Sequence, residues 1–214
     1  ASDVYKRQME DYPADLTVLD SAKVENGLFA FEGKVEHSTL GYLSLDARKP
    51  FTSFILENAP IRIEGTLADR KSFTAASPLN DSLARFQEQM KTFSERRNAV
   101  RGSKEQCRAV WEEQYDYTYR TVVANADNFL AVRILSRYPL NFRSPHELLD
   151  AIDRLSEPMQ QYYMIRRHLK PQVERQVRTA EGETYFDIEA ENPAGETVSL
   201  RQAVENPANN YVLC

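Results

Sequence analysis

The spacing of apolar residues changes once along this chain, near Ser77, and this change limits the fold more than any other feature. Between residue 9 and about Phe73, apolar and polar residues alternate in short runs, as in strands with one buried face. From Ser77 onward the apolar residues recur every three or four positions, which is the pattern of an amphipathic helix. The sequence therefore predicts an α+β protein, in which an antiparallel β sandwich or partial barrel precedes a helical block.

The first part is predicted to contain several short strands. Asn26-Gly27 separates two alternating runs, and this dipeptide favours a type I′ hairpin turn because both central residues need positive φ. After the turn, alternation predicts Phe29 and Phe31 on the face opposite to Leu28. The further runs are Leu40–Leu45, Phe51–Leu56 and Ile61–Leu67.

The helical block is predicted to begin at Pro78. Ser77 and Ser144 each precede a proline and are expected to be N-caps, with Glu147 completing a capping box with Ser144. Gly102-Ser103 is expected to separate the first two helices, and the last helix is expected to end near Lys170. The residues expected on buried faces are Leu79, Leu83, Phe86, Met90, Phe93, Cys107, Val110, Trp111, Gln114, Tyr115, Thr118, Val122, Phe129, Val132 and Leu135.

Aromatic residues cluster in the second helix. Trp111 and Tyr115 are four residues apart and belong to its core face. Tyr117 and Tyr119 lie off that face, and the β region is one candidate packing partner for them. Packing in the core or between domains is the expectation for these aromatic residues, with a cofactor-stacking site as the weaker alternative.

No catalytic, cofactor-binding or metal-binding residue is assigned from the sequence, and no cofactor is expected. Cys107 is interpreted as a small buried side chain, and Cys214 falls where an apolar strand residue is expected, so neither is read as a catalytic thiol. The three histidines lack the spacing of a metal site; they are His37 in a turn, His146 near a helix start and His168 near a helix end.

The net charge is -5, and Lys and Arg are interleaved with Glu and Asp. Nucleic acid is therefore not expected as a partner, because phosphate binding needs a concentrated basic face. No apolar run reaches the roughly 18 to 20 residues that cross a bilayer. Residues 1–8, ASDVYKRQ, look like the translation of a sequencing-library adapter, and we expect them to lie outside the fold.

The last stretch, from about residue 181, is predicted to contain a β ribbon and then the start of a buried strand. That strand is expected at Asn210–Leu213, and we expect the chain to stop inside this unfinished element. Residues from about 180 onward are therefore expected to be poorly packed.

The same stretch resembles the entry into the thioredoxin-like domain of TlpA/ResA-type thiol–disulfide oxidoreductases. The resemblance implies a glycine-containing hairpin that leads to a strand, then a short helix and then a further strand. The β region in turn resembles a β-rich N-terminal domain of unknown function that precedes such modules in envelope proteins of Gram-negative bacteria. The helical block resembles the linker between the two domains. The residues that carry the N-terminal resemblance are Asp20, Ser21, Val24, Gly27, Phe29, Phe31, Gly33, Leu56, Glu57, Asn58, Ile61, Ile63, Gly65, Ser77 and Asn80.

The resemblance implies four segments: an adapter-derived tail at 1–8, the β-rich domain at 9–76, a helical linker region at 77–178 and the truncated start of a thioredoxin-like domain at 179–214. It further implies an envelope or periplasmic parent protein that exchanges disulfides with a protein thiol or disulfide partner, through a Cys-X-X-Cys beyond Cys214. A lipid anchor upstream is left open.

Three functions stay open at this point. In the first, the chain is the N-terminal portion of that oxidoreductase and is itself inactive. In the alternative, it is a non-enzymatic envelope binding or scaffolding module. An exposed apolar or aromatic groove between the β region and Tyr117 and Tyr119 would favour the alternative. In the third, the N-terminal part is only a spacer or a dimerisation element.

Overall fold

The computed structural model describes residues 3–9, 16–45, 50–180, 182 and 187–208 of the 214-residue chain. It divides into two compact units, residues 1–173 and 174–214. The predicted α+β fold, with antiparallel strands followed by helices, is confirmed, and the described strands do not close into a barrel. Of the helices that the structure describes, each is too short or too polar to cross a bilayer.

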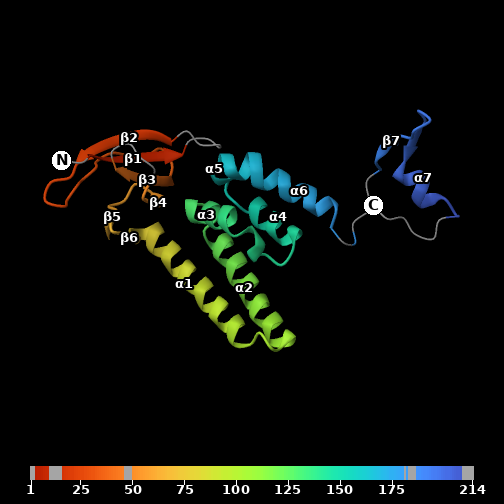
Figure 1. The fold of residues 1–214 in the computed structure, drawn as a ribbon, viewed down its shortest axis with the longest axis horizontal. Coiled ribbons are helices and arrows are strands. Elements are labelled where there is room, and N and C mark those ends of the chain that lie inside the picture. The colour runs from red at the N-terminus through yellow and green to blue at the C-terminus, as the bar shows by residue number, and fades with distance from the viewer. Residues whose placement is uncertain (1–2, 10–15, 46–49, 181, 183–186, 209–214) are drawn as a thin grey trace. The chain divides into compact units, whose positions relative to one another are not determined.

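The first unit opens with a four-stranded antiparallel sheet in the order β2-β1-β3-β4 (Figure 1). A separate antiparallel hairpin, β5–β6, leads from the sheet to the first helix. The strands are β1 (Asp3–Met9), β2 (Leu16–Lys23), β3 (Thr39–Leu45), β4 (Thr52–Leu56), β5 (Arg62–Thr66) and β6 (Asp69–Ala76). Strands β3, β4 and β5 were predicted from alternation, whereas β6 was not.

The position of β1 differs from the sequence-based expectation. Residues 1–8 were expected to lie outside the fold, but Asp3–Met9 pairs with β2 on one side and with β3 on the other. Its backbone thus supplies the hydrogen-bonding partners of two strands. The sheet has β2 and β4 as its edges.

The predicted turn at Asn26-Gly27 is confirmed, because both residues have positive φ, 51° and 78°. The flanking residues Glu25 and Leu28 exchange two backbone hydrogen bonds of 2.9 Å. The run after the turn is not a strand, although Phe29 and Phe31 are half-buried while Leu28 is 75% exposed. The alternating pattern therefore predicted which side chains are buried. It did not predict that this run lacks the backbone hydrogen bonds of a strand. The two phenylalanines pack on the β-region core of Leu43, Phe54 and Leu56.

The helical block follows directly. It contains α1 (Pro78–Ala99), α2 (Lys104–Ala124), α3 (Phe129–Arg137), the 3₁₀ turn Pro139–Asn141, α4 (Pro145–Asp153), α5 (Glu157–Gln160), the π-helical segment Met164–Leu169 and α6 (Lys170–Arg178). α1 and α2 form an antiparallel pair (Figure 1). Ser103 caps α2 and Asn128 caps α3 through their side chains. α3 is buried almost all round and forms the centre of the core.

The helix that was expected to end near Lys170 continues to Arg178. Pro171 lies inside it, where it has no N–H to donate and where its ring crowds the carbonyl of residue 167. The π-helical segment directly before it changes the hydrogen-bond register, with the Lys170 N–H donating to the Ile165 carbonyl. This register change lets the helix pass the proline, since π-bulges re-space the backbone bonds.

The second unit contains a hairpin of β7 (Glu189–Glu191) and β8 (Thr197–Ser199), followed by α7 (Leu200–Glu205). The predicted ribbon is confirmed, and the short helix that the resemblance implies is present. Ser199 and Gln202 form a full capping box at the start of α7. No side chain among residues 187–208 is buried, as expected from the sequence. The predicted strand at Asn210–Leu213 lies outside the described residues.

A candidate ligand-binding cleft

The residues that carried the family resemblance form a structural junction between β4 and α1. Asn80, in the first turn of α1, accepts a hydrogen bond from the Ile55 N–H and donates one to the Ile55 carbonyl, both at 2.8 Å. Glu57, just after β4, accepts from the Leu79 N–H at 2.9 Å and from the Ser77 hydroxyl at 2.6 Å. The edge strand and the helix terminus thus satisfy each other's free backbone groups.

The two N-caps expected from the sequence differ in detail. Ser77 occupies the N-cap position of α1 but makes no capping bond, because Glu57 takes that role. Ser144 caps α4 by accepting from the Glu147 N–H. The Glu147 carboxylate accepts from the Arg143 N–H at 2.6 Å rather than from Ser144, so the reciprocal half of the predicted capping box is absent among the contacts of the described residues.

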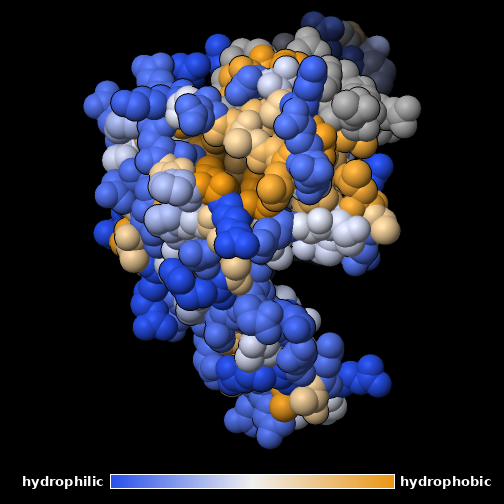
Figure 2. Space-filling view, turned by 90° about the vertical axis from the view of Figure 1, so that its left-hand side faces the viewer, coloured by the Kyte–Doolittle hydropathy of each residue, from blue (hydrophilic) through white to orange (hydrophobic). Residues whose placement is uncertain are grey.

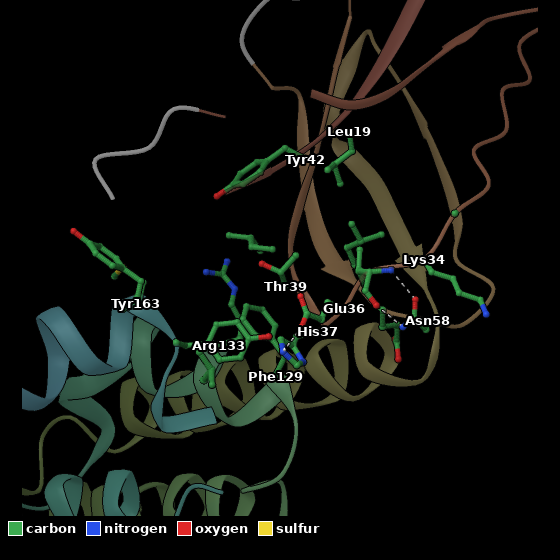
Figure 3. A pocket seen from close by; sticks show the side chains of 18 of the residues that line it. Leu19, Lys34, Glu36, His37, Thr39, Tyr42, Asn58, Phe129, Arg133 and Tyr163 are labelled. Atoms are coloured by element: carbon green, nitrogen blue, oxygen red, sulfur yellow. Dashed lines mark hydrogen bonds and ion pairs between the residues drawn. The ribbon is translucent and has the colours of Figure 1, made fainter. Parts of the chain in front are cut away.

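A cleft of about 910 Å³ lies in the first unit, between the sheet side of β3 and the helices α3 and Met164–Leu169 (Figure 3). Its lining combines apolar and aromatic side chains with a similar number of polar and charged ones. Apolar walls with convergent polar groups are typical of a binding pocket. The main wall residues are Leu40, Tyr42, Leu56, Phe129, Val132 and Tyr162. The Phe129 and Tyr162 rings are in contact, with their centroids 5.1 Å apart.

Arg133 is the central polar residue of the cleft. It projects from α3 into the cavity, toward Tyr42 and Thr39 of β3 (Figure 3). Its side chain is half-buried, and its guanidinium has no hydrogen bond or ion pair with any described residue. Burial lowers the pKa of Arg133, although a guanidinium stays charged at any physiological pH. The cleft therefore contains a positive charge that the described part of the chain does not neutralise.

Two tyrosines give the cleft further polar atoms. The Tyr162 hydroxyl donates to the Ser38 carbonyl, and burial raises the pKa of Tyr162 to about 12. Burial also raises the pKa of Tyr42, against the opposing effect of the Arg133 charge. The Tyr42 hydroxyl makes no hydrogen bond within the described residues. At neutral pH it is thus a protonated donor facing the same cavity as Arg133.

We expect Tyr162 to make the stability of the first unit sensitive to alkaline pH. A tyrosine in the unfolded chain loses its proton near pH 10, whereas folded Tyr162 keeps it until about 12. In this window the unfolded state binds fewer protons, so the free energy of unfolding falls as pH rises, by about 1–2 kcal/mol from this residue. Below pH 10 the contribution is constant.

Urea unfolding of the wild type and of Tyr162→Phe at pH 9 and pH 11.5 measures this effect. The difference in unfolding free energy between the two proteins should shrink at the higher pH. Tyr163→Phe, which removes the neighbouring hydroxyl, serves as the control for the other tyrosines. An unchanged difference between wild type and Tyr162→Phe would contradict the assignment.

The rim of the cleft is acidic. Asp20, Glu32 and Glu36 line it, together with Lys34 and His37. His37 lies 3.7 Å from the Glu36 carboxylate and is exposed, in the turn where the sequence placed it. The other two histidines do not line the cleft. His146 is in the first turn of α4, as predicted, whereas His168 is within the continuous helix and not near its end.

The aromatic residues of α2 do not line the cleft. Tyr117 stacks on Phe86 of α1 with centroids 5.8 Å apart, and Tyr119 donates its hydroxyl to Asp150 of α4. The expected core packing is confirmed for Tyr117, whose partner is α1, and Tyr119 contacts α4. Among these contacts of the two tyrosines within the described residues, none is with the β region, because α1 and α4 cover those positions of α2. Trp111 and Tyr115 stack on each other at 5.6 Å, as expected for neighbours on one helix face.

Cys107 is half-buried and lies 3.4 Å from the Val100 carbonyl, at the end of the α1–α2 pair. This position is consistent with the interpretation of Cys107 as a small packed side chain. Among the described residues, no group of histidine, cysteine and carboxylate side chains has the arrangement of a metal site.

A second groove, of about 610 Å³, lies in the β region and is lined mainly by Leu28, Phe29, Phe31, Ile61 and Ile63. Figure 2 shows apolar side chains gathered in a hollow on the β side of the protein, with polar side chains around it.

Comparison with known proteins identifies one part of the chain. Residues 2–106 match a family model described as a domain of unknown function (DUF4369). The match covers just under half of the chain, from β1 to the first residues of α2. The predicted resemblance to an N-terminal domain of unknown function is confirmed at this level. No curated protein and no solved structure gives a significant match.

Arg133 was missed by sequence reasoning. The sequence FLAVRIL contains one charged residue within a run of apolar residues that are all buried in α3. A single charge inside such a run was the signal available, since charged residues are seldom placed on a buried face without a partner.

Proposed function

We propose that the first unit is a non-enzymatic binding module and that the cleft between β3 and α3 is its ligand site. The observation that carries the proposal is the half-buried Arg133, whose charge has no partner among the described residues, inside a cavity of about 910 Å³. A pocket with apolar walls and a few convergent polar groups is suited to binding. A groove between the β region and Tyr117 and Tyr119 was the feature that would favour a binding module. The cleft lies beside the β region, but Tyr42, Phe129 and Tyr162 line it, and Tyr117 and Tyr119 do not.

A neutral apolar dye, N-phenyl-1-naphthylamine, tests whether the cleft takes a ligand. The wild-type chain is expected to bind it with enhanced fluorescence, and Thr39→Trp, which places a large ring in the cleft, should weaken binding at least about tenfold, equivalent to 1.4 kcal/mol. Leu140→Trp is the matched control, because Leu140 is 87% exposed and does not line the cleft.

Circular dichroism melting of both variants separates a blocked cleft from an unfolded protein. Equal dye binding by the wild type and a folded Thr39→Trp would refute the proposed site.

We propose as a second candidate that the parent protein is an envelope thiol–disulfide oxidoreductase with a protein thiol or disulfide partner. The feature that supports it is the order β7, β8 and α7, which fits the hairpin, strand and short helix of the resemblance. An insulin-reduction assay on the parent protein tests it. Cysteine-dependent reduction is the expected result, and a parent without this activity would contradict the redox role.

A further inference from the structure

We infer that the cleft binds a monocarboxylate with an apolar or aromatic body, and that Arg133 is the residue that binds the carboxylate. This inference rests on the proposed function of the cleft and assigns its ligand class.

The charge of Arg133 is costly to bury. Its side chain is half-buried against apolar walls, and it lacks a neutralising partner within the described residues. Removing a charge from water without such a partner costs free energy. A bound anion offsets that cost, and a planar carboxylate can accept two parallel N–H bonds from a guanidinium. The unliganded cleft is therefore prepared for an anion.

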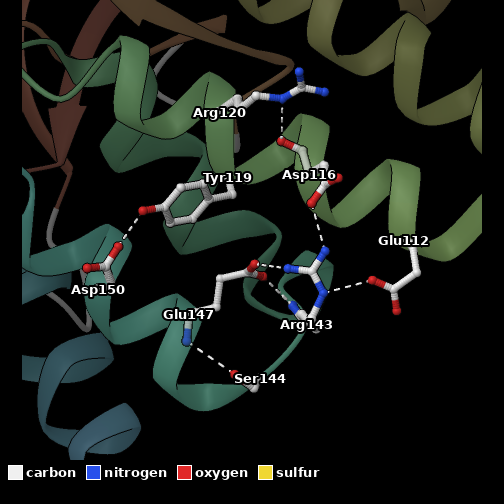
Figure 4. A network of polar contacts seen from close by, with 8 residues as sticks. All are labelled: Glu112, Asp116, Tyr119, Arg120, Arg143, Ser144, Glu147 and Asp150. Atoms are coloured by element: carbon white, nitrogen blue, oxygen red, sulfur yellow. Dashed lines mark hydrogen bonds and ion pairs between the residues drawn. The ribbon is translucent and has the colours of Figure 1, made fainter.

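Other arginines of the first unit show how this chain usually neutralises guanidinium groups. Arg143 bridges Glu112 and Asp116, each at 2.7 Å, and also contacts Glu147 (Figure 4). The hydrogen bonds to Asp116 and Glu112 raise the pKa of Arg143. Arg97, which is half-buried like Arg133, lies over the Trp111 ring at 3.9 Å and donates to Gln114. Arg133 has a comparable degree of burial without comparable contacts.

The charge of the rim limits the ligand to a single negative charge. Four carboxylates, of Asp20, Glu32, Glu36 and Glu57, line the cleft, whereas its Lys and Arg side chains are Lys34 and Arg133 alone. A dianion such as a phosphate monoester would be repelled by this rim. A monoanion can form an ion pair with Arg133, and it carries no second negative charge for the rim carboxylates to repel. The charge pattern thus favours a carboxylate over a phosphate.

The walls define the rest of the ligand. Phe129, Val132 and Leu40 offer apolar surface next to Arg133, and the Tyr162 ring contacts Phe129. The Tyr42 hydroxyl faces the cavity from the opposite wall, where it can donate to the second lone pair of a bound carboxylate (Figure 3). A cavity of about 910 Å³ holds an aromatic or branched acid, or the last residues of a peptide with a free C-terminus.

Calorimetric titration with 2-naphthaleneacetic acid and with its neutral amide tests the inference on the full chain. The acid is expected to bind at least about tenfold more tightly than the amide, in line with the strength of charge-assisted bonds. Arg133→Gln should remove this preference. Tyr42→Phe should reduce the preference several-fold.

Arg137→Gln is the matched control, because Arg137 is exposed on the same helix and the variant changes the net charge equally. The inference is overturned if the wild type binds acid and amide equally, or if the preference for the acid survives Arg133→Gln. Dye binding by the wild type would show that the cleft itself still takes a ligand in that case. If the dye also fails to bind, the proposed function of the cleft falls with it.

The same titration with a short peptide ending in Leu-Phe, as free acid and as C-terminal amide, separates the two sources of a carboxylate. Tighter binding of the peptide acid than of 2-naphthaleneacetic acid assigns the site to a chain terminus, and the reverse order assigns it to a small acid. Failure of both acids to bind overturns the inference.

Discussion

Replacing Asn80 by alanine is expected to lower the free energy of unfolding of the first unit by about 3–5 kcal/mol. The Asn80 side chain is 5% exposed and completes the hydrogen bonding of the Ile55 N–H and carbonyl. Its removal leaves both backbone groups buried without a partner, at a cost of about 1–3 kcal/mol each. Urea denaturation followed by circular dichroism measures the loss.

Asn58 provides the matched control for this prediction. Its side chain makes the same pair of bonds, to the N–H and carbonyl of Val35, but at an exposed position. Water can replace the lost amide there, so Asn58→Ala should cost only about 0.5–1.5 kcal/mol. Equal losses for the two variants would show that burial at the β4–α1 junction is not the source of the Asn80 effect.

Gly65→Ala is expected to destabilise the β5–β6 hairpin by about 2–3 kcal/mol, the upper range for overpacking a well-filled site. A Cβ at this position would lie 2.5 Å from the Phe73 ring and 2.7 Å from the Phe73 Cα. The ring is itself in contact with Phe51, at a centroid distance of 4.7 Å, so it cannot move without disturbing a second side chain. Thermal unfolding of the variant measures the loss.

Gly102→Ala tests whether crowding explains the Gly65 effect. An added Cβ at Gly102 would meet no atom within 4 Å, and φ there is not positive. The substitution should be neutral or stabilising by about 0.4–1 kcal/mol, because alanine restricts the unfolded chain. A loss at both positions would indicate a general cost of replacing glycine, and would contradict the assignment to Phe73.

Local periodicity predicted most of the elements correctly. The spacing of Phe86 and Phe93 located α1, and both side chains are buried as expected. Alternation located β3, β4 and β5 and the half-buried state of Phe29 and Phe31. These features depend on residues that are close together in the sequence, because side-chain direction repeats with a fixed period along a helix or a strand.

The errors concern contacts between distant residues. The β region was a candidate packing partner for Tyr117 and Tyr119 because their spacing excludes them from the main face of α2. Spacing does not reveal that α1 and α4 cover those positions. The order of strands around β1 likewise depends on pairing across many residues. The cleft could not be predicted for the same reason. Tyr42 and Arg133 are 91 positions apart in the printed sequence and face one another only in the folded chain.

The junction between β4 and α1 also determines which parts of the protein can open separately. The Ile55 amide belongs to a strand and the Leu79 amide to a helix, yet each donates to a side chain from the other side of the junction. Neither bond survives if the strand and the helix move apart. Hydrogen exchange at the two amides therefore reports one opening event with one free energy, so β4 and the start of α1 belong to the same foldon.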